Sequence, residues 1–327
     1  MRFRMIGKLR LLALAAIALA GGCGSYTPKY VENLVLPHQE NMSRGTDRIL
    51  LVPIAGPILA EGADLPLSSP EEGPLTRATR DLRRGAQDPR VVAAILRINS
   101  PGGGVTASDA LRREVEAFRK TGRPVVVYAE ELNASGGYYV STAADWIVSN
   151  PTTVTGSIGV ISMYFNVEGL LSKVGVAETT FKSGPHKDMT GLFRKMDPEE
   201  CGIFQGIVDE LYGRFVDMVS AGRPRLKRDQ VKSLADGRVY TAAQALENGL
   251  VDQVGYLEDA AEAARRLAKV GEEVRLISYE RLHEGLVLEI LNVKGGVPPP
   301  RAGLEMSVGV HNLLGARTPH FYYLWMP

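Results

Sequence analysis

Two glycine-rich stretches carry residue types that suit acyl-transfer chemistry. The first is Asn99–Gly104, and the second is Asn133–Tyr139, which has a serine at position 135. Each follows a short apolar run typical of a buried strand and precedes a run typical of a helix. Such a junction gathers backbone N–H groups at the positive end of a helix, where they stabilise an oxyanion. Because only the second stretch places a hydroxyl at the turn, Ser135 is the candidate nucleophile.

A serine nucleophile needs a base within hydrogen-bond reach. The chain has five histidines, and only His186 lies within the region of alternating strands and helices. Lys187 and Asp188 follow it, and a lysine serves as a base if burial lowers its pKa from about 10.4. Neighbouring side chains of an extended segment point in opposite directions, so only one of His186 and Lys187 can face Ser135. Lys182, on a predicted strand, is the nearest competing lysine.

Apolar periodicity predicts an α/β fold. Strands are predicted over residues 49–54, 91–98, 124–129, 146–149, 158–161, 177–182 and 273–279. Helices are predicted over residues 74–87, 107–120, 136–144, 198–222, 228–235, 241–248 and 257–269. The alternation predicts a mainly parallel sheet with right-handed crossovers, followed by a group of C-terminal helices.

The N-terminal residues are typical of an export signal. Basic residues precede an apolar stretch over residues 11–20, which is too short to span a bilayer and suits a signal peptide over residues 1–22. The segment ending in Cys23 resembles a lipobox, in which the cysteine is lipidated. Ala20 stands where leucine is commoner, so a plain secretory signal or a short anchor is the alternative. Either case predicts an exported protein, and lipidation predicts a membrane-anchored lipoprotein that faces the periplasm or the cell exterior.

Composition excludes several other classes. Residues 23–46 are polar and aperiodic, which suits a tether. The formal net charge of +1 gives no reason to expect a nucleic-acid partner. With Cys23 lipidated, only Cys201 remains, so no internal disulfide is expected. No metal-ligand spacing and no phosphate-binding loop is evident, so neither a metal nor another cofactor is expected.

Four motifs carry a resemblance to a known family. They are Ser100–Gly103, Ala134–Tyr139, Thr155–Val160 and Gly184–Asp188. In this order, over residues 47–279, the chain resembles the signal peptide peptidase A family of serine proteases. The resemblance implies a fold of the Clp protease/crotonase type, built from repeated ββα units, and a Ser–Lys dyad.

When the family's residue roles are transferred to the matching positions of this sequence, the resemblance implies a role for each motif. It implies Ser135 as the nucleophile, Lys187 as the general base and Ser157 as the hydroxyl that orients the lysine amine. The implied oxyanion hole consists of the backbone N–H groups of Gly102 or Gly103 and of Gly136.

The resemblance also implies an assembly and a substrate class. The chain carries one copy of the unit, like the short family members, whose dyads are completed by neighbouring subunits in a ring-like homo-oligomer. We expect a peptidase domain over residues 47–280 and an aromatic tail over 281–327 that packs on its own or a neighbouring subunit. With the lipobox, the protein is expected to be a membrane-tethered endopeptidase of short or unfolded peptides, and the resemblance implies cleaved signal peptides as the substrate class.

Plainer alternatives remain open for each motif. Ser135 is also a suitable helix cap, Ser157 a simple turn residue, and the glycine run a tight turn. The same fold also suits a crotonase-type acyl-thioester enzyme, or a non-catalytic lipoprotein that binds peptides or supports assembly. The aromatic residues at 321–326 most often would pack on a domain, and a substrate-like position in the active site is the alternative.

Overall fold

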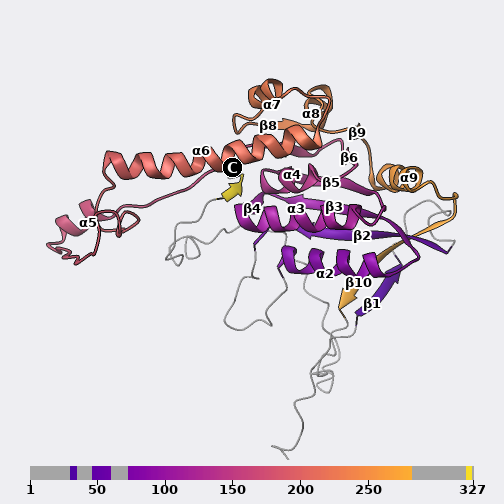
Figure 1. Cartoon of the computed structure of the whole chain (residues 1–327), viewed down its shortest axis with the longest axis horizontal. Coiled ribbons are helices and arrows are strands. Elements are labelled where there is room, and N and C mark those ends of the chain that lie inside the picture. Colours follow the sequence, from indigo (N-terminus) through magenta and orange to yellow (C-terminus); the bar gives the residue numbers. More distant parts are fainter. Residues whose placement is uncertain (1–29, 35–45, 60–72, 282–321, 326–327) are drawn as a thin grey trace, which may run out of the picture. The chain divides into compact units, whose positions relative to one another are not determined.

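The computed structural model describes residues 30–34, 46–59, 73–281 and 322–325 (Figure 1). The predicted signal peptide, Cys23, most of the tether and most of the 281–327 segment lie outside the described residues. The chain forms two compact units. The smaller one, residues 1–32 and 280–294, holds most of β1 (Tyr30–Leu34) and the end of β10 (Val274–Arg281). Among the described helices, none is long and apolar enough to cross a membrane.

The larger unit is built on a parallel sheet, which confirms the predicted α/β class. The strand order is β10, β2 (Asp47–Ala55), β3 (Val91–Ser100), β5 (Val125–Ala134), β6 (Trp146–Ser149) and β9 (Gln253–Val254), and each neighbouring pair is parallel. At the end of β5, the short strand β7 (Val154–Gly156) adds in parallel and pairs in turn with antiparallel β8 (Val239–Thr241). The repeated ββα units implied by the resemblance stay an expectation.

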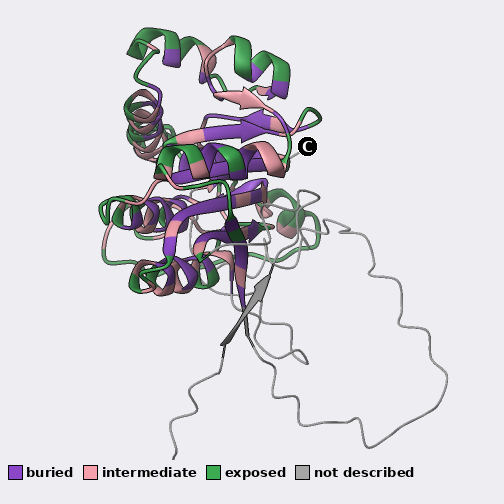
Figure 2. Ribbon diagram, turned by 90° about the vertical axis from the view of Figure 1, so that its right-hand side faces the viewer, coloured by how far each residue is buried: buried purple, intermediate pink, exposed green. Residues whose placement is uncertain are grey.

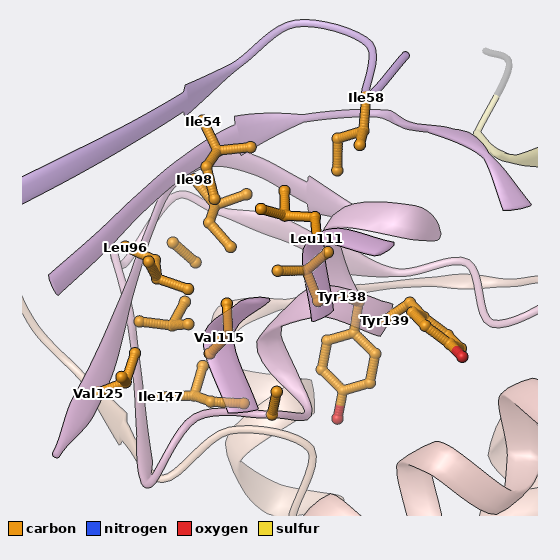
Figure 3. Close-up of a cluster of buried hydrophobic side chains, with 14 of the residues drawn as sticks. Ile54, Ile58, Leu96, Ile98, Leu111, Val115, Val125, Tyr138, Tyr139 and Ile147 are labelled. Carbon is orange, nitrogen blue, oxygen red and sulfur yellow. The ribbon is translucent and has the colours of Figure 1, made fainter. Parts of the chain in front are cut away.

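Helices cover both faces of this sheet. On one face, α2 (Pro74–Gln87) and α3 (Val105–Arg119) bury an aliphatic core that includes Leu96, Leu111 and Val115 (Figure 3). On the other face, α9 (Leu257–Ala268) packs its alanines closely against the strands. The central strands are buried on both faces, which accounts for their continuous apolar runs (Figure 2). The sheet is therefore a rigid support for the loops at its ends.

The remaining helices follow the sheet in sequence. The short helix α4 (Gly136–Ser141) begins directly after β5, and α7 (Arg228–Leu234) and α8 (Ala242–Glu247) lie near β8. The long helix α6 (Pro198–Gly222) begins with a capping box between Asp197 and Glu200. Only its C-terminal part packs into the core, and it reaches away from the sheet to α5 (Glu168–Lys173) at its far end (Figure 1).

Two predicted strands are wrong. Residues 177–182 form no regular secondary structure and are exposed, and no strand in the described part of the chain pairs with them. Residues 158–161 contribute only an isolated bridge at Ile161. The segment around Gly184–Asp188 is a series of turns and not an extended chain, so side-chain alternation does not apply to His186 and Lys187. We refer to residues 163–203, which include this segment, as the arm.

Candidate active site

Ser135 lies in a strained turn between β5 and α4. Its φ of 51° and ψ of −112° are rarely adopted by a residue with a side chain, and such strain persists only where the surroundings impose it. The residue is 1% exposed, and its N–H donates to the carbonyl of Gly156 at 2.8 Å. Ser135 holds the N-cap position of α4, yet its side chain makes no capping hydrogen bond. The capping alternative therefore does not explain this serine.

The structure brings Ser157 beside Ser135. Ala134 and Gly156 are partners in the parallel register of β5 and β7, so the two serines follow paired residues at adjacent strand ends. Ser157 is also in the left-handed region, with a φ of 48°, and its N–H donates to the carbonyl of Arg238 at 2.8 Å. Two of the three non-glycine residues with positive φ in the described part of the chain are these serines.

The first glycine stretch abuts the start of α4. A Cβ atom built on Gly102, whose φ is 103°, would lie 2.6 Å from the backbone nitrogen of Gly136. The N–H of Gly102 donates to Oγ of Ser100 at 3.1 Å, so it is committed to an internal bond. Of the three predicted oxyanion donors, Gly103 and Gly136 are therefore the stronger candidates. Their backbones approach closely, and only glycine permits this approach at Gly102.

A buried hydroxyl that sequence reasoning missed lies next to these glycines. Ser108, on α3, is fully buried, and its Oγ has no hydrogen-bond partner. A Cβ built on Gly136 would lie 2.4 Å from this oxygen and 3.0 Å from the nitrogen of Gly103. A serine one turn into a predicted helix carries no signal of its own in the sequence.

We refer to the four residues Ser135, Ser157, Gly103 and Gly136 as the serine site.

The same chain holds Lys187 far from the serine site. Lys187 lies in the arm between α5 and α6, at the far end of α6 from α4 (Figure 1). Phe215 of α6 packs against Tyr139 of α4 with ring centroids 5.1 Å apart. Pro198, where α6 begins, lies about 25 Å along the helix axis from Phe215 at 1.5 Å per residue. The Lys187 side chain is exposed, and the described residues give it no ion-pair partner.

An ion cluster centred on Arg194 organises this end of the arm. The guanidinium donates to both carboxylate oxygens of Glu200, at 2.5 and 2.8 Å, and to Asp188 at 2.6 Å. Hydrogen bonds from Arg194 lower the pKa of Glu200 to about 2 and hold the pKa of Asp188 well below its usual range. Lys182 also binds Asp188, at 2.8 Å, and His186 lies 3.6 Å from Glu200. Of the two residues considered as rival bases, Lys182 is thus paired within this cluster and His186 lies beside it.

Most of the exposed large apolar side chains in the described residues belong to the arm. Phe181 is 95% exposed, and Leu170 and Val174 are each more than half exposed. The others on the arm are Met163, Phe165, Val176, Leu192, Phe193 and Ile203. A concentration of this kind is typical of a surface that another protein covers.

Comparison with known proteins identifies relatives of the region just described. The family model described as Peptidase family S49 matches residues 117–271. The chain is 37% identical over 243 residues to a signal peptide peptidase SppA homologue of Enterococcus faecium, covering 74% of this chain and 70% of that protein. It is 40% identical to Protease 4 of Salmonella typhi, covering 58% of this chain and 30% of that protein. It is 32% identical to the chloroplastic serine protease SPPA of Arabidopsis thaliana, covering 73% of this chain and 36% of that protein.

Proposed function

Because the chain belongs to the signal peptide peptidase A family of serine peptidases, peptidase family S49, we propose that it cleaves peptides with a Ser135–Lys187 dyad. The proposed substrates are short or unfolded peptides, cleaved signal peptides among them. In this proposal the dyad is shared between two copies of the chain, and Cys23 carries the lipid that tethers the protein to a membrane.

The observation that carries the proposal is the strained, buried turn at Ser135. The backbone conformation of this residue is unfavourable in free energy for a serine, and its side chain makes no capping hydrogen bond that would offset the strain. The turn instead brings Ser135 next to Ser157, and the following residue, Gly136, lies against the backbone of Gly102 and Gly103. This is the arrangement that a nucleophile with an oxyanion hole requires.

In the proposed mechanism, the neutral Lys187 amine removes the proton of the Ser135 hydroxyl as its oxygen bonds to the scissile carbonyl carbon. The N–H groups of Gly103 and Gly136 donate to the oxyanion of the tetrahedral intermediate. Lys187 then gives the proton to the leaving amine, and water hydrolyses the acyl-enzyme. Ser157, adjacent to Ser135, accepts or donates a hydrogen bond that orients the lysine amine.

The arm supports a dyad formed between copies. Asp188, next to Lys187 in the chain, pairs with Arg194, which also binds Glu200 at the start of α6. That start lies about 25 Å along the helix axis from Phe215, which packs on α4, so Lys187 does not reach Ser135 of its own chain. The exposed apolar side chains of the arm suit docking on a neighbouring copy, which would bring Lys187 to that copy's serine site. Docking would also take the amine out of water, which favours its neutral form. A closed ring of copies follows if each arm reaches the next molecule.

Peptidase measurements on the full chain in detergent test this function. Ser135→Ala and Lys187→Ala should each lower the hydrolysis of apolar peptides by about 10⁴-fold, since each removes one member of a unit. Ser135→Ala should also abolish labelling by a fluorophosphonate, which reacts with activated serines.

Two matched variants control for general damage. Ser233→Ala removes an exposed serine on α7, and Lys195→Ala removes an exposed lysine on the arm; both should keep full activity. A chain that assembles normally but neither cleaves peptides nor reacts with the probe would contradict the proposed function.

A further inference from the structure

The turns that carry Lys187 are connected by backbone hydrogen bonds. The N–H of Lys187 donates to the carbonyl of Gly184 at 3.3 Å. The N–H of Gly191 donates to the carbonyl of Asp188 at 2.8 Å. The backbone on either side of Lys187 therefore has a defined course, although the described residues give the side chain of Lys187 no ion-pair partner.

One carboxylate oxygen joins these turns to two cations. Oδ1 of Asp188 accepts hydrogen bonds from the Arg194 guanidinium at 2.6 Å and from the Lys182 amine at 2.8 Å. The Lys182 amine also donates to the carbonyl of Pro185 at 2.9 Å. Asp188 is thus held by two positively charged side chains, and the residue that precedes it in the chain is Lys187.

Arg194 connects this carboxylate to the first turn of α6. Its guanidinium donates to both carboxylate oxygens of Glu200, whose side chain is 1% exposed. Glu200 also accepts from the N–H of Asp197 at 3.0 Å in the capping box, so the helix fixes its position. Because the planar guanidinium binds two carboxylates at once, it sets the turns around Lys187 at one place relative to α6.

The ion cluster also balances the charge beside Lys187. Its members are Lys182, His186, Asp188, Arg194, Glu199 and Glu200. Without Arg194, the Asp188 carboxylate would lose the partner that connects it to α6 and could pair with the Lys187 amine. Such a pair favours the charged form of the amine, which has no lone pair to accept a proton.

We propose that Arg194 and Asp188 are positioning residues for Lys187. Arg194 binds Asp188 and Glu200 together, which orients the turns that present Lys187 to the serine site of a neighbouring copy. The same contact keeps the Asp188 carboxylate from pairing with the Lys187 amine. This role rests on the proposed function, in which Lys187 accepts the proton of Ser135.

The pH dependence of peptide hydrolysis by the full chain in detergent tests this role. In the wild type, kcat should rise with pH as the Lys187 amine becomes neutral. In Arg194→Gln the released Asp188 carboxylate favours the charged amine, so this rise should move by about one pH unit to higher pH. At a pH within the rise, kcat should therefore fall about tenfold while KM stays within about twofold of the wild type, and the loss should disappear at higher pH.

A double variant separates the effect of charge from an effect on folding. Arg194→Gln combined with Asp188→Asn removes the released carboxylate as well as the cation, so the rise in kcat should return to within about 0.3 pH unit of its wild-type position. A purely structural role predicts the opposite, because the second substitution removes a further contact. Arg265→Gln is the matched control, since Arg265 binds Glu262 through two hydrogen bonds of 2.5 and 2.7 Å on α9, outside the arm. Its pH profile should match that of the wild type.

A second single variant serves if Arg194→Gln does not fold. Lys182→Ala removes the other cation on Asp188 from an exposed position, and it should lower kcat about threefold within the same rise, with recovery at higher pH. Wild-type pH profiles for Arg194→Gln and Lys182→Ala would overturn the positioning role. The proposed function would still stand in that case if Lys187→Ala abolishes hydrolysis, whereas a wild type that cleaves nothing would disprove both.

Discussion

The serine site and the arm are stabilised in different ways. The serine site is buried at the ends of β5 and β7, and backbone hydrogen bonds fix both of its serines in strained conformations. The arm projects from the fold on α6, exposes apolar side chains and depends on ion pairs around Arg194. One chain thus completes the surroundings of Ser135 but not those of Lys187. The difference is what the proposed dyad between copies would explain, since in that proposal a surface on another molecule completes the surroundings of the lysine.

Replacing Lys187 by arginine should have the largest effect on activity. Lys187→Arg keeps the positive charge and the hydrogen-bond donors, but arginine is not deprotonated in proteins and cannot act as a base. Peptide hydrolysis should fall about 10⁴-fold if the residue accepts the Ser135 proton. Lys195→Arg, on the same arm, is the control and should leave the rate unchanged. A Lys187→Arg variant with near-normal kcat would mean that the residue acts only through its charge.

Substitution of Gly102 should damage the serine site directly. Gly102→Ala adds a Cβ that would lie 1.9 Å from the backbone oxygen of Tyr323, at a φ of 103°. Thermal unfolding should show a loss of about 3 kcal/mol, because backbone must move in addition to the conformational strain. Gly122→Ala has a φ of 85° with open space around the new methyl, so it should cost about 1 kcal/mol. Equal losses for the two variants would show that the close approach at Gly102 is unimportant.

The ion cluster makes the arm sensitive to acid. In the folded chain the pKa of Glu200 is about 2, below its ordinary value of about 4.3. The charged carboxylate therefore contributes its full stabilisation of the arm at a pH above about 4.3. The contribution is lost as the pH falls from about 4 towards 2. Pepsin cleavage near Phe181 and Phe193, measured relative to cleavage of an unfolded reference peptide at the same pH, should therefore accelerate in the wild type across this interval.

Arg194→Gln provides the reference for this acid transition. It removes the cation that lowers the pKa of Glu200, so at pH 4 pepsin should cleave the arm of the variant faster than that of the wild type, whereas at pH 2.5 the two rates should be similar. Identical pH profiles for the wild type and Arg194→Gln would show that the cluster does not hold the arm.

The smallest expected effect concerns assembly. Phe181→Ser removes an apolar side chain that is 95% exposed in the single chain, so the fold should be unchanged. Association between copies should weaken about tenfold if this side chain is buried in the interface. Tyr256→Ser, which is 58% exposed on another part of the molecule, is the control. Sedimentation that is identical for Phe181→Ser and the wild type would place the interface elsewhere.

Local sequence signals predicted most of the fold. The bounds of α2, β6 and α6 match the predicted ranges, since Pro74 and Pro198 mark helix starts and β6 is a short apolar run. The strand predicted over 177–182 failed because its apolar residues meet no partner strand among the residues that the structure describes. The pairing of β4 (Gly102–Gly104) with β11 (Tyr322–Leu324) joins segments more than 200 residues apart, and a run of glycines has low strand propensity.

The serine site was predictable to a similar extent. Sequence motifs identified Ser135 and Ser157 as candidate site residues, and the register of β5 and β7 brings these two residues together. The internal bond of Gly102 to Ser100 and the buried hydroxyl of Ser108 depend on side-chain packing that no local pattern encodes. The distance between Lys187 and Ser135 also follows from the direction of α6, which the amphipathic pattern of that helix does not determine.

Complementation between inactive copies tests the central claim most directly. Full-length Ser135→Ala and Lys187→Ala chains are purified separately, mixed in equal amounts, dissociated and reassembled in detergent, and assayed on one apolar peptide. If Ser135 of one copy works with Lys187 of its neighbour, random assembly of a symmetric ring should restore about a quarter of the wild-type activity. A mixture as inactive as its two components, despite normal mixed assembly, would contradict a dyad shared between copies.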